Sequence, residues 1–403
     1  MKITLLRVLS FILFINVGCK RKANFQLPDQ AKGLENLTVF PEDPDPMLTI
    51  DLLHEIRVDD TDLDNNFFGG WTGIEVDDQG RIYIGDFSGH SIIVIHPAGY
   101  HETTLGREGS GPGEFRMVGT MKIIDDHIYV RDAQRFTMTS FSLDTHEVRE
   151  TINMNRFPDN QDEFDELLEE PDVPRQTFLL SNGTYLAGYF GPGITNIEDP
   201  LYNLEEERYR NYYIIDSEWV VSHKLFDLRE AADLVATVDG QHRFNLVPLP
   251  FLGNSLKAIS NDGYIYTAWS EDFLIKAYGP SGYKYAFYYP YQRKSLYKEE
   301  AISLFSVEDE WNRGLIEHAE LPETWPALHT MIVDDEDRLW VSTFSKEEGM
   351  LKWWILKSSG ELISTFNWPM NRSIVKVKNN YLYTRETDEM EVVSINRYRI
   401  EME

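Results

Sequence analysis

Residues 73–86 read GIEVDDQGRIYIGD: an apolar strand, an acidic turn, and a second strand built around Ile-Tyr-Ile. The turn carries Asp and Gly, which adopt the backbone angles that a tight hairpin requires. A polar loop and two more strand-like stretches complete the unit, and no helical periodicity separates its strands. The segment therefore predicts a small antiparallel sheet rather than a strand joined to a helix.

The same unit recurs along the chain. Its copies begin near residues 73, 121, 176, 256, 329 and 373, and the third copy is stretched, with its third strand expected only at 212–215. Four antiparallel strands repeated around an axis form the blades of a propeller. We therefore predict an all-β fold, a six-bladed β-propeller of four-stranded antiparallel blades, with short helical insertions between blades at 295–305 and 308–318.

One linker carries a family resemblance. The stretch LGREGSGPGEF at residues 105–115 resembles the linker between blades of NHL-repeat propellers, and more closely that of six-bladed propeller lipoproteins of Gram-negative bacteria. The patterns from Asp77 to Asp86 and from Pro326 to Val341 are similar to the same family. The resemblance covers about residues 47–403 and implies the fold, while propellers of this kind have unrelated activities.

A closed propeller must join its last blade to its first. Residues 48–58 read LTIDLLHEIRV and have strand character that no copy of the unit uses. We expect part of this stretch to be the outer strand of the last blade, because that arrangement ties the two chain ends together and removes an exposed sheet edge. The propeller domain is accordingly expected over 47–403.

The N-terminus resembles a bacterial lipoprotein signal. Residues 1–18 combine a positive start with a short apolar run, and Cys19 follows Gly18 as the only cysteine of the chain. Asn16 stands where this pattern usually has an aliphatic residue, so an ordinary signal peptide beside a free thiol is the alternative. We expect a signal peptide over 1–18, lipidation of Cys19, and a flexible, Pro-containing tether over 19–46.

The net charge of −29 bears on partners. Such a surface repels phosphate backbones, which argues against nucleic-acid binding. It is also repelled by anionic lipid, so membrane attachment is expected through the N-terminal lipid alone. The lone cysteine excludes an intramolecular disulfide and any site built from several Cys ligands.

Acidic insertions are the main candidates for a binding face. Residues 155–175 and 189–211 are rich in Asp and Glu, and lie where loops gather at one rim of a propeller. A solvated loop explains such runs, and so does a contact surface for a basic partner. The acids lack the spacing of a dedicated calcium loop. No cofactor is therefore expected, with Ca²⁺ left open.

Motifs for catalysis are missing from the sequence: there is no His-Glu-x-x-His, no Gly-x-Ser-x-Gly and no Walker-type loop. We expect no catalytic residues and no metal site. Individual residues remain candidates for ligand binding, because basic and aromatic side chains near the rim can hold an anion or stack on a sugar. These are His329, Arg107, Arg116, Arg131, Arg135 and Trp71.

Two functions follow as hypotheses. The first is a monomeric, lipid-anchored envelope protein whose rim binds a protein, peptide or glycan without catalysis. The second is a metal-dependent propeller hydrolase or lyase, lactonase-like or amidating-lyase-like, with its site in the central channel; it needs several ligands converging from different inner strands. By resemblance, Lys20-Arg21-Lys22 lacks the acidic residues that mark surface export, which favours the periplasmic side.

Overall fold

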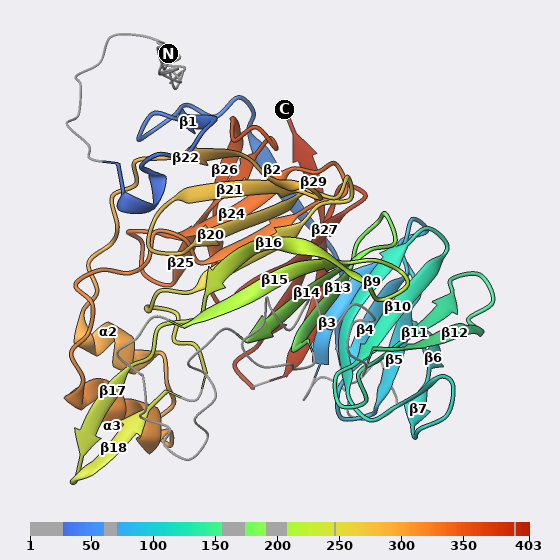
Figure 1. Ribbon diagram of the computed structural model, residues 1–403. Helices are drawn as coiled ribbons and strands as arrows, with labels where there is room; N and C mark the ends of the chain where they lie inside the picture. Colours follow the sequence, from blue (N-terminus) through green and yellow to red (C-terminus); the bar gives the residue numbers. More distant parts are fainter. Residues whose placement is uncertain (1–26, 60–70, 155–173, 191–207, 246, 391) are drawn as a thin grey trace, which may run out of the picture.

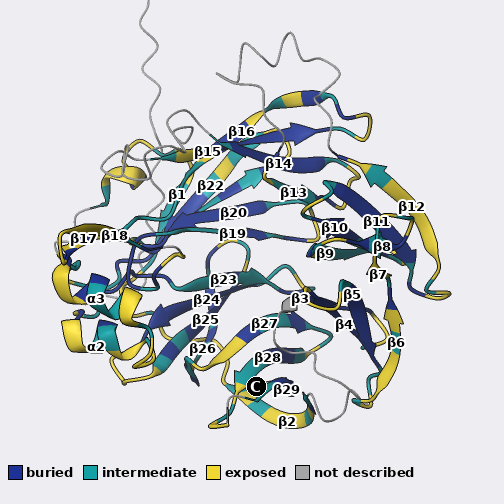
Figure 2. Ribbon diagram, turned by 90° about the horizontal axis from the view of Figure 1, so that it is seen from below, coloured by how far each residue is buried: buried dark blue, intermediate teal, exposed yellow. Residues whose placement is uncertain are grey.

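The computed structural model describes residues 27–59, 71–154, 174–190, 208–245, 247–390 and 392–403. Within these residues six sheets of four or five strands stand around a common axis (Figure 1). Viewed from below, the inner strands gather at the centre and the outer strands form the periphery (Figure 2). The prediction of a six-bladed propeller with antiparallel blades is confirmed.

The first three blades follow the chain from inner to outer strand. Blade I contains β3 (Trp71–Val76), β4 (Ile82–Asp86), β5 (Ser91–Ile95) and β6 (His101–Leu105). Blade II contains β9 (Val118–Ile124), β10 (His127–Asp132), β11 (Thr137–Ser142) and β12 (Val148–Asn153). Blade III contains β13 (Gln176–Leu179), β14 (Tyr185–Phe190), β15 (Tyr209–Ile215) and β16 (Val221–Arg229).

The last three blades repeat this order. Blade IV contains β19 (Ser255–Ile259), β20 (Ile265–Trp269), β21 (Leu274–Gly279) and β22 (Gly282–Tyr288). Blade V contains β23 (Thr330–Val333), β24 (Leu339–Phe344), β25 (Met350–Leu356) and β26 (Leu362–Pro369). Blade VI contains β27 (Arg372–Lys378), β28 (Tyr381–Thr387) and β29 (Val393–Met402), with β2 (Ile50–Asp59) as its outer strand.

Aspartates hold the turns between the first two strands of a blade. In blade I, Oδ1 of Asp77 accepts hydrogen bonds from the backbone N–H groups of Gln79 and Arg81, at 3.0 and 2.9 Å. Its Oδ2 accepts from Nε of Arg81 at 2.6 Å and from the hydroxyl of Tyr83 at 3.2 Å. One buried carboxylate therefore fixes both the turn and the start of the second strand.

Blade V repeats the arrangement. Oδ1 of Asp334 accepts from the N–H groups of Glu336 and Arg338, at 3.0 and 2.9 Å. Its Oδ2 accepts from Nε of Arg338 at 2.6 Å and from Nε1 of Trp340 at 2.8 Å. The recurrence of Asp at this position thus has a structural cause, as the hairpin chemistry predicted.

Hydrophobic side chains fill the spaces between neighbouring blades. Tyr83 and Val94 of blade I and Val130 and Phe141 of blade II belong to one fully buried cluster. These residues alternate along their strands with others that face the preceding blade, so both faces of each sheet are covered. Within the described part of the chain, no helix has the length and apolar character to cross a membrane.

The N-terminal strand β2 completes blade VI. It runs antiparallel to β29, with Ile50 opposite Met402 and Asp59 opposite Ser394. The two ends of the propeller are therefore held by one ladder of backbone hydrogen bonds. Paired β2 also covers the edge that β29 would otherwise expose.

The segment before β2 also packs on the propeller. Strand β1 (Leu37–Val39) pairs in parallel with β22 and gives blade IV a fifth strand. Phe40 stacks on Tyr289 with ring centroids 4.8 Å apart. The expectation of a flexible tether through residue 46 is therefore wrong for residues 37–40, because their apolar side chains cover the outer edge of this blade. Cys19 and the signal peptide lie outside the described residues.

Candidate functional site

The long links that the structure describes leave the propeller at the same end. In four-stranded antiparallel blades, the links between the second and third strands and those between blades emerge at one end of the sheets. Of the expected acidic insertions, residues 155–173 and 191–207 lie outside the described part of the chain. The links from β16 to β19 and from β22 to β23 are described.

These two links build one accessory lobe beside the blades (Figure 1). The lobe consists of the hairpin β17 (Val235–Val238) and β18 (Gln241–Phe244) and the helices α2 (Lys298–Ser303) and α3 (Glu310–His318). The helices fall inside the ranges 295–305 and 308–318 that the sequence predicted. The α3 helix begins at Asp309, whose side chain caps it by accepting from the N–H of Asn312 at 3.0 Å.

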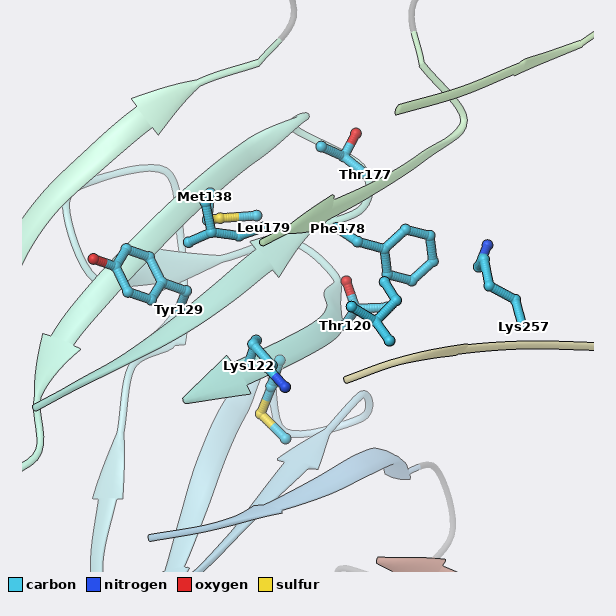
Figure 3. A pocket seen from close by; sticks show the side chains of 10 residues that line it. Thr120, Lys122, Tyr129, Met138, Thr177, Phe178, Leu179 and Lys257 are labelled. Carbon is cyan, nitrogen blue, oxygen red and sulfur yellow. The ribbon is translucent and has the colours of Figure 1, made fainter. Parts of the chain in front are cut away.

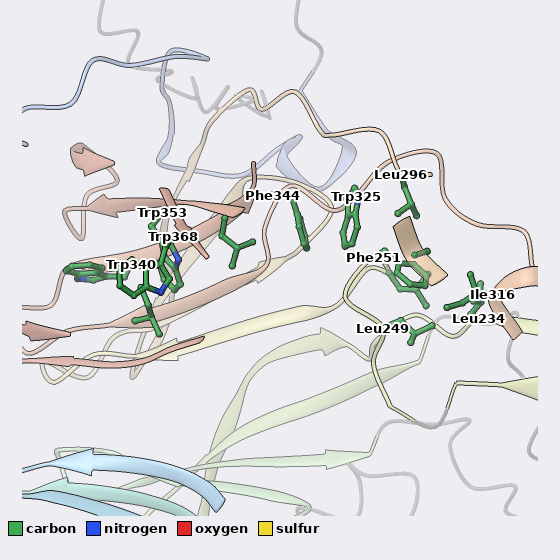
Figure 4. Packing of buried hydrophobic residues seen from close by; sticks show 14 of the residues in the cluster. Leu234, Leu249, Phe251, Leu296, Ile316, Trp325, Trp340, Phe344, Trp353 and Trp368 are labelled. Atoms are coloured by element: carbon green, nitrogen blue, oxygen red, sulfur yellow. The ribbon is translucent and has the colours of Figure 1, made fainter. Parts of the chain in front are cut away.

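The lobe shares its hydrophobic core with the propeller (Figure 4). Trp325 lies between the two parts: its ring centroid is 6.2 Å from that of Phe251 and 4.3 Å from that of Phe344 in blade V. Leu315 and Ile316 of α3 are completely buried in the same cluster. The lobe is therefore mounted rigidly on the blades.

Polar contacts also fasten the helices to the hairpin. Nε1 of Trp311 donates to the carbonyl oxygen of Phe244 at 3.1 Å, and the Arg243 guanidinium lies 5.1 Å from the Trp311 ring centroid. Nζ of Lys298 donates at 2.9 Å to the carbonyl oxygen of Glu317 in the last turn of α3. A cation at a helix C-terminus is favourable because the carbonyl groups there carry partial negative charge.

The lobe nevertheless leaves several large apolar side chains in solvent. Val307 is 77% exposed, Tyr297 65% and Trp311 39%, and Leu304, Val235 and Val247 are exposed too. The same helical link is acidic, with eight Asp and Glu and two Lys and Arg between residues 295 and 323. Single exposed apolar residues are ordinary, whereas several on one small lobe are typical of an interaction surface.

Charged side chains from three neighbouring inner strands meet in the central channel. Glu75 on β3, Lys122 on β9 and Lys376 on β27 each lie opposite a tyrosine of the second strand in their blade. Nζ of Lys376 lies 2.8 Å from Oε2 of Glu75. Burial, reinforced by the positive charge of Lys376, lowers the pKa of Lys122.

Sequence reasoning did not select these channel residues. The signal was present, because a charged residue stands within the apolar first strand of copies one, two and six. Comparing equivalent positions of the copies, rather than searching for local motifs, would have found them. The channel of the described chain is thus lined by an acid and several lysines.

The predicted arginines lie mostly around the linker after blade I, and each has partners within the protein. The Arg107 guanidinium donates to Oε1 of Glu114, with Nη2 at 2.8 Å, and Arg116 pairs with Glu108 at 3.2 Å. Arg135 donates to the carbonyl oxygen of Glu114 at 3.2 Å. Arg131 stands apart, buried beside Phe136.

Glu114 organises this linker. Its carboxylate also accepts from the N–H groups of Ser110 and Gly111, at 2.9 and 2.8 Å. The hydrogen bonds from Gly111, Arg107 and Ser110 lower the pKa of Glu114 to about 2. The arginines and the Gly-rich turn are therefore joined in one structural network, and their binding of an external anion stays a prediction.

The last two predicted residues differ in what surrounds them. His329 precedes β23 and its ring lies 5.1 Å from that of Phe344. Burial lowers the pKa of His329 to about 4, so the ring is neutral near pH 7. Trp71 begins β3, where its backbone pairs with Asp86. Among the described side chains, His329 does not share a site with the arginines.

The hypothesis of a metal-dependent hydrolase or lyase requires a metal centre. In the part of the chain that the structure describes, no three His, Cys, Asp or Glu side chains are grouped closely enough to hold a metal ion. The acidic residues of the turns are instead engaged with backbone N–H groups and arginines, as Asp77 and Asp334 are.

Comparison with known proteins agrees with the fold. Residues 62–166 match a family described as a 6-bladed beta-propeller. The chain has this architecture. The match confirms the resemblance to six-bladed propellers that the linker and turn motifs indicated.

Solved structures with similar topology come from proteins of different kinds. A protein of Bacteroides fragilis whose description suggests export shares 12% identity with a TM-score of 0.49, covering 91% of this chain and 99% of its own. Regucalcin of Agrobacterium tumefaciens, a calcium-binding protein, shares 12% identity with a TM-score of 0.39, covering 90% and 96%. Virginiamycin B lyase of Staphylococcus aureus shares 14% with a TM-score of 0.35, covering 88% and 90%. No curated protein matches the chain.

Proposed function

We propose that this protein is an exported, lipid-anchored propeller that acts as a non-catalytic binding module, monomeric and facing the periplasm. Its partner is a protein, peptide or glycan held at the end of the propeller where the insertions gather. The observation that supports this most directly is the accessory lobe, which is rigidly mounted on the core yet exposes apolar side chains to solvent.

The chemistry of the lobe favours a protein or peptide partner. Tyr297 and Val307 offer apolar contact area, and aromatic residues are enriched at the buried centres of interfaces. The excess of acidic residues around them would attract a basic partner and speed its association. A rigid platform loses little conformational entropy when it binds.

Site-specific photo-crosslinking in intact cells tests this proposal. A photoreactive residue at position 307 should give one defined crosslinked protein. The same residue at position 100 should not, although Tyr100 is 54% exposed, because the link from β5 to β6 joins the third and fourth strands of blade I and emerges at the opposite end of the propeller. Equal crosslinking from both positions would contradict a dedicated surface.

The identified partner then allows a quantitative test. Val307→Glu combined with Tyr297→Glu should weaken its affinity at least tenfold, by about 1.4 kcal/mol or more, since charges would be buried at the centre of the interface. Tyr100→Glu, at the opposite end of the propeller, is the matched control and should bind normally. Unchanged affinity of the double variant would exclude the lobe as the docking site.

Anchoring is tested separately at Cys19. The wild-type protein should sediment with membranes and resist extraction by salt, because acyl chains and not charge hold it there. Cys19→Ser should release it into the soluble fraction, and the N-terminal peptide should lose the mass of the lipid. A soluble wild-type protein would contradict lipid anchoring, and digestion by protease added to intact cells would contradict the periplasmic side.

A further inference from the structure

The described chain begins on the outer edge of blade IV. Leu27 and Ala31 pack with Leu274 of this blade in one apolar cluster, and Ala31 is almost completely buried. From there the chain continues along the edge until β1 pairs with β22. The propeller therefore holds the chain from residue 27 onward, and a lipid on Cys19 is joined to it only through residues 20–26.

Polar contacts fix the same segment. The hydroxyl of Tyr283 donates to the carbonyl oxygen of Glu35 at 2.5 Å, and Nδ2 of Asn36 donates to that of Lys284 at 3.0 Å. The ladder between β1 and β22 continues these contacts. Buried apolar side chains, hydrogen bonds and strand pairing together attach this segment firmly to blade IV.

The reach of the remaining tether follows from covalent geometry. Leu27 follows Cys19 by eight positions, and an extended chain advances by at most about 3.6 Å per residue, so the two Cα atoms lie within about 29 Å of each other. This limit holds for any conformation of residues 20–26. A lipid on Cys19 therefore keeps the outer edge of blade IV within this distance of the bilayer surface.

The propeller is wider than this reach. Blade I stands opposite blade IV in the ring of six, and Figure 2 shows β6 and β22 at opposite sides of the molecule. Nine strands from β1 to β6 cross this diameter, and at a spacing of about 4.8 Å they give a width of roughly 40 Å. With the outer edge of blade I on the bilayer, Leu27 would lie beyond the reach of the tether. Blade I must therefore point away.

Charge disfavours an approach by either end of the propeller. At the end that carries the lobe, residues 295–323 contain eight Asp and Glu against two Lys and Arg. At the opposite end, the turns between the first and second strands of the blades contain nine Asp and Glu against two Lys and Arg. These turns are residues 77–81, 125–126, 180–184, 260–264, 334–338 and 379–380. An anionic lipid surface repels both ends.

The edge of blade IV differs from the two ends. Residues 27–40 and β22 contain Lys32 and Lys284 against Asp29 and Glu35, so this edge is neutral in a chain with a net charge of −29. Both lysines are exposed. The surface nearest to the anchor is thus one that an anionic bilayer does not repel.

We propose that the outer edge of blade IV, formed by residues 27–40 and β22, faces the headgroups of a lipid bilayer, while blade I points away from it. This orientation rests on the lipid anchor at Cys19 that is part of the function proposed above. The propeller axis then runs along the membrane plane, and the end that carries the accessory lobe opens to the side, where a partner can reach it. The short tether sets the orientation of the protein as well as its location.

Energy transfer from labelled residues to the bilayer measures this orientation. The full-length lipidated chain is reconstituted in vesicles of phosphatidylethanolamine and phosphatidylglycerol that contain an acceptor dye on a lipid headgroup. Cys19 is the only cysteine and carries the lipid, so a single introduced cysteine takes the donor dye alone. Donors are placed with Lys284→Cys on the edge of blade IV and with Tyr100→Cys on blade I, since both residues are exposed.

Two further donors report on the ends of the propeller. Val307→Cys lies on the lobe and Asp126→Cys in a turn at the opposite end, and both side chains are largely exposed. We expect the strongest transfer from position 284 and weaker transfer from positions 307 and 126. Transfer from position 100 should be at background level, because blade I lies roughly 40 Å farther from the bilayer. Equal transfer from positions 284 and 100 would overturn the proposal, and so would strongest transfer from either end.

A longer tether supplies the matched control. Twenty Gly and Ser residues inserted between Gln26 and Leu27 keep the lipid and the propeller and add an average reach of roughly 25 Å. Transfer from position 284 should then fall toward that from position 100. An unchanged difference between the two positions would overturn the tether as its cause.

Flotation of the vesicles separates this proposal from the one on which it rests. A wild-type chain that does not float with the vesicles would overturn the lipid anchor and the orientation with it. A chain that floats but shows equal transfer from positions 284 and 100 would overturn the orientation alone. Thermal unfolding of the labelled variants checks that each is folded.

Discussion

Replacing Asp334 by Asn tests how much the buried carboxylate of a turn contributes to the stability of its blade. The carboxylate is completely buried, and its Oδ2 accepts hydrogen bonds from Nε of Arg338 and Nε1 of Trp340. Asn has the same shape but offers one oxygen and one NH₂ group. Because the shape is conserved, no cavity forms. In either orientation of the side chain, however, the NH₂ group faces two donors, so two hydrogen bonds are lost.

The magnitude follows from the groups left without a partner. A buried donor that loses its acceptor costs about 1–3 kcal/mol, and breaking a buried ion pair costs about 3–5 kcal/mol. Arg338 keeps a second partner, Glu336, at 3.0 Å, which reduces the second cost. We expect a loss of about 3–5 kcal/mol in the free energy of unfolding, or about 4–6 °C in Tm for a chain of this size.

Differential scanning calorimetry near pH 7 measures this effect. Asp77→Asn should be less destabilising, because in blade I the Tyr83 hydroxyl takes the place of the Trp340 indole N–H and can accept a hydrogen bond from the new NH₂ group. Glu336→Gln is the control, since Glu336 is largely exposed and exposed ion pairs contribute about 0–1 kcal/mol. The expected difference in Tm between Asp334→Asn and this control is roughly 4–6 °C, and a difference of less than about 1 °C would refute the reasoning.

Two further predictions concern other parts of the molecule. Gly360→Ala should lower Tm by several degrees in a thermal unfolding scan, because Gly360 has φ +92° and a Cβ there would lie 2.5 Å from Cγ of Phe287; an unchanged Tm would contradict it. The pKa of Glu114 is lowered to about 2, so the hydrogen bonds of its carboxylate are complete above the ordinary pKa of a glutamate and are lost as the pH falls toward about 2. The amide signals of Ser110 and Gly111 should shift in NMR spectra over this pH range, and they should stay constant in Glu114→Gln.

Local chemistry made much of the fold predictable. The turns at Asp77 and Asp334 form from residues within four positions of each other, so their pattern is visible in the sequence. The alternation of apolar residues in each copy likewise reflects contacts that every blade repeats. The helices of the lobe were found for the same reason: the predicted end of α3 at His318 is confirmed, whereas the other three ends were placed two or three residues too far out.

The candidate sites were much less predictable. The arginines were chosen because they are basic and near the rim, but Arg107 and Arg116 have acidic partners that only folding brings close. Lys122 and Lys257 are 135 positions apart in the chain, and nothing in either local sequence shows that they share a cavity. Whether a charge is balanced is a property of neighbours in space.

The sequence by itself determined the repeated unit GIEVDDQGRIYIGD and thus the blades, because hairpins depend on turn residues and alternation over a few positions. The tertiary structure alone decided which strands that are far apart in the sequence lie side by side. It placed β1 against β22, where a flexible tether was expected, and paired β2 with β29. It also set β13 apart from its neighbouring inner strands, which leaves a cavity between blades II, III and IV (Figure 3). These features depend on packing between blades, a long-range balance of burial and charge that no single copy of the unit contains.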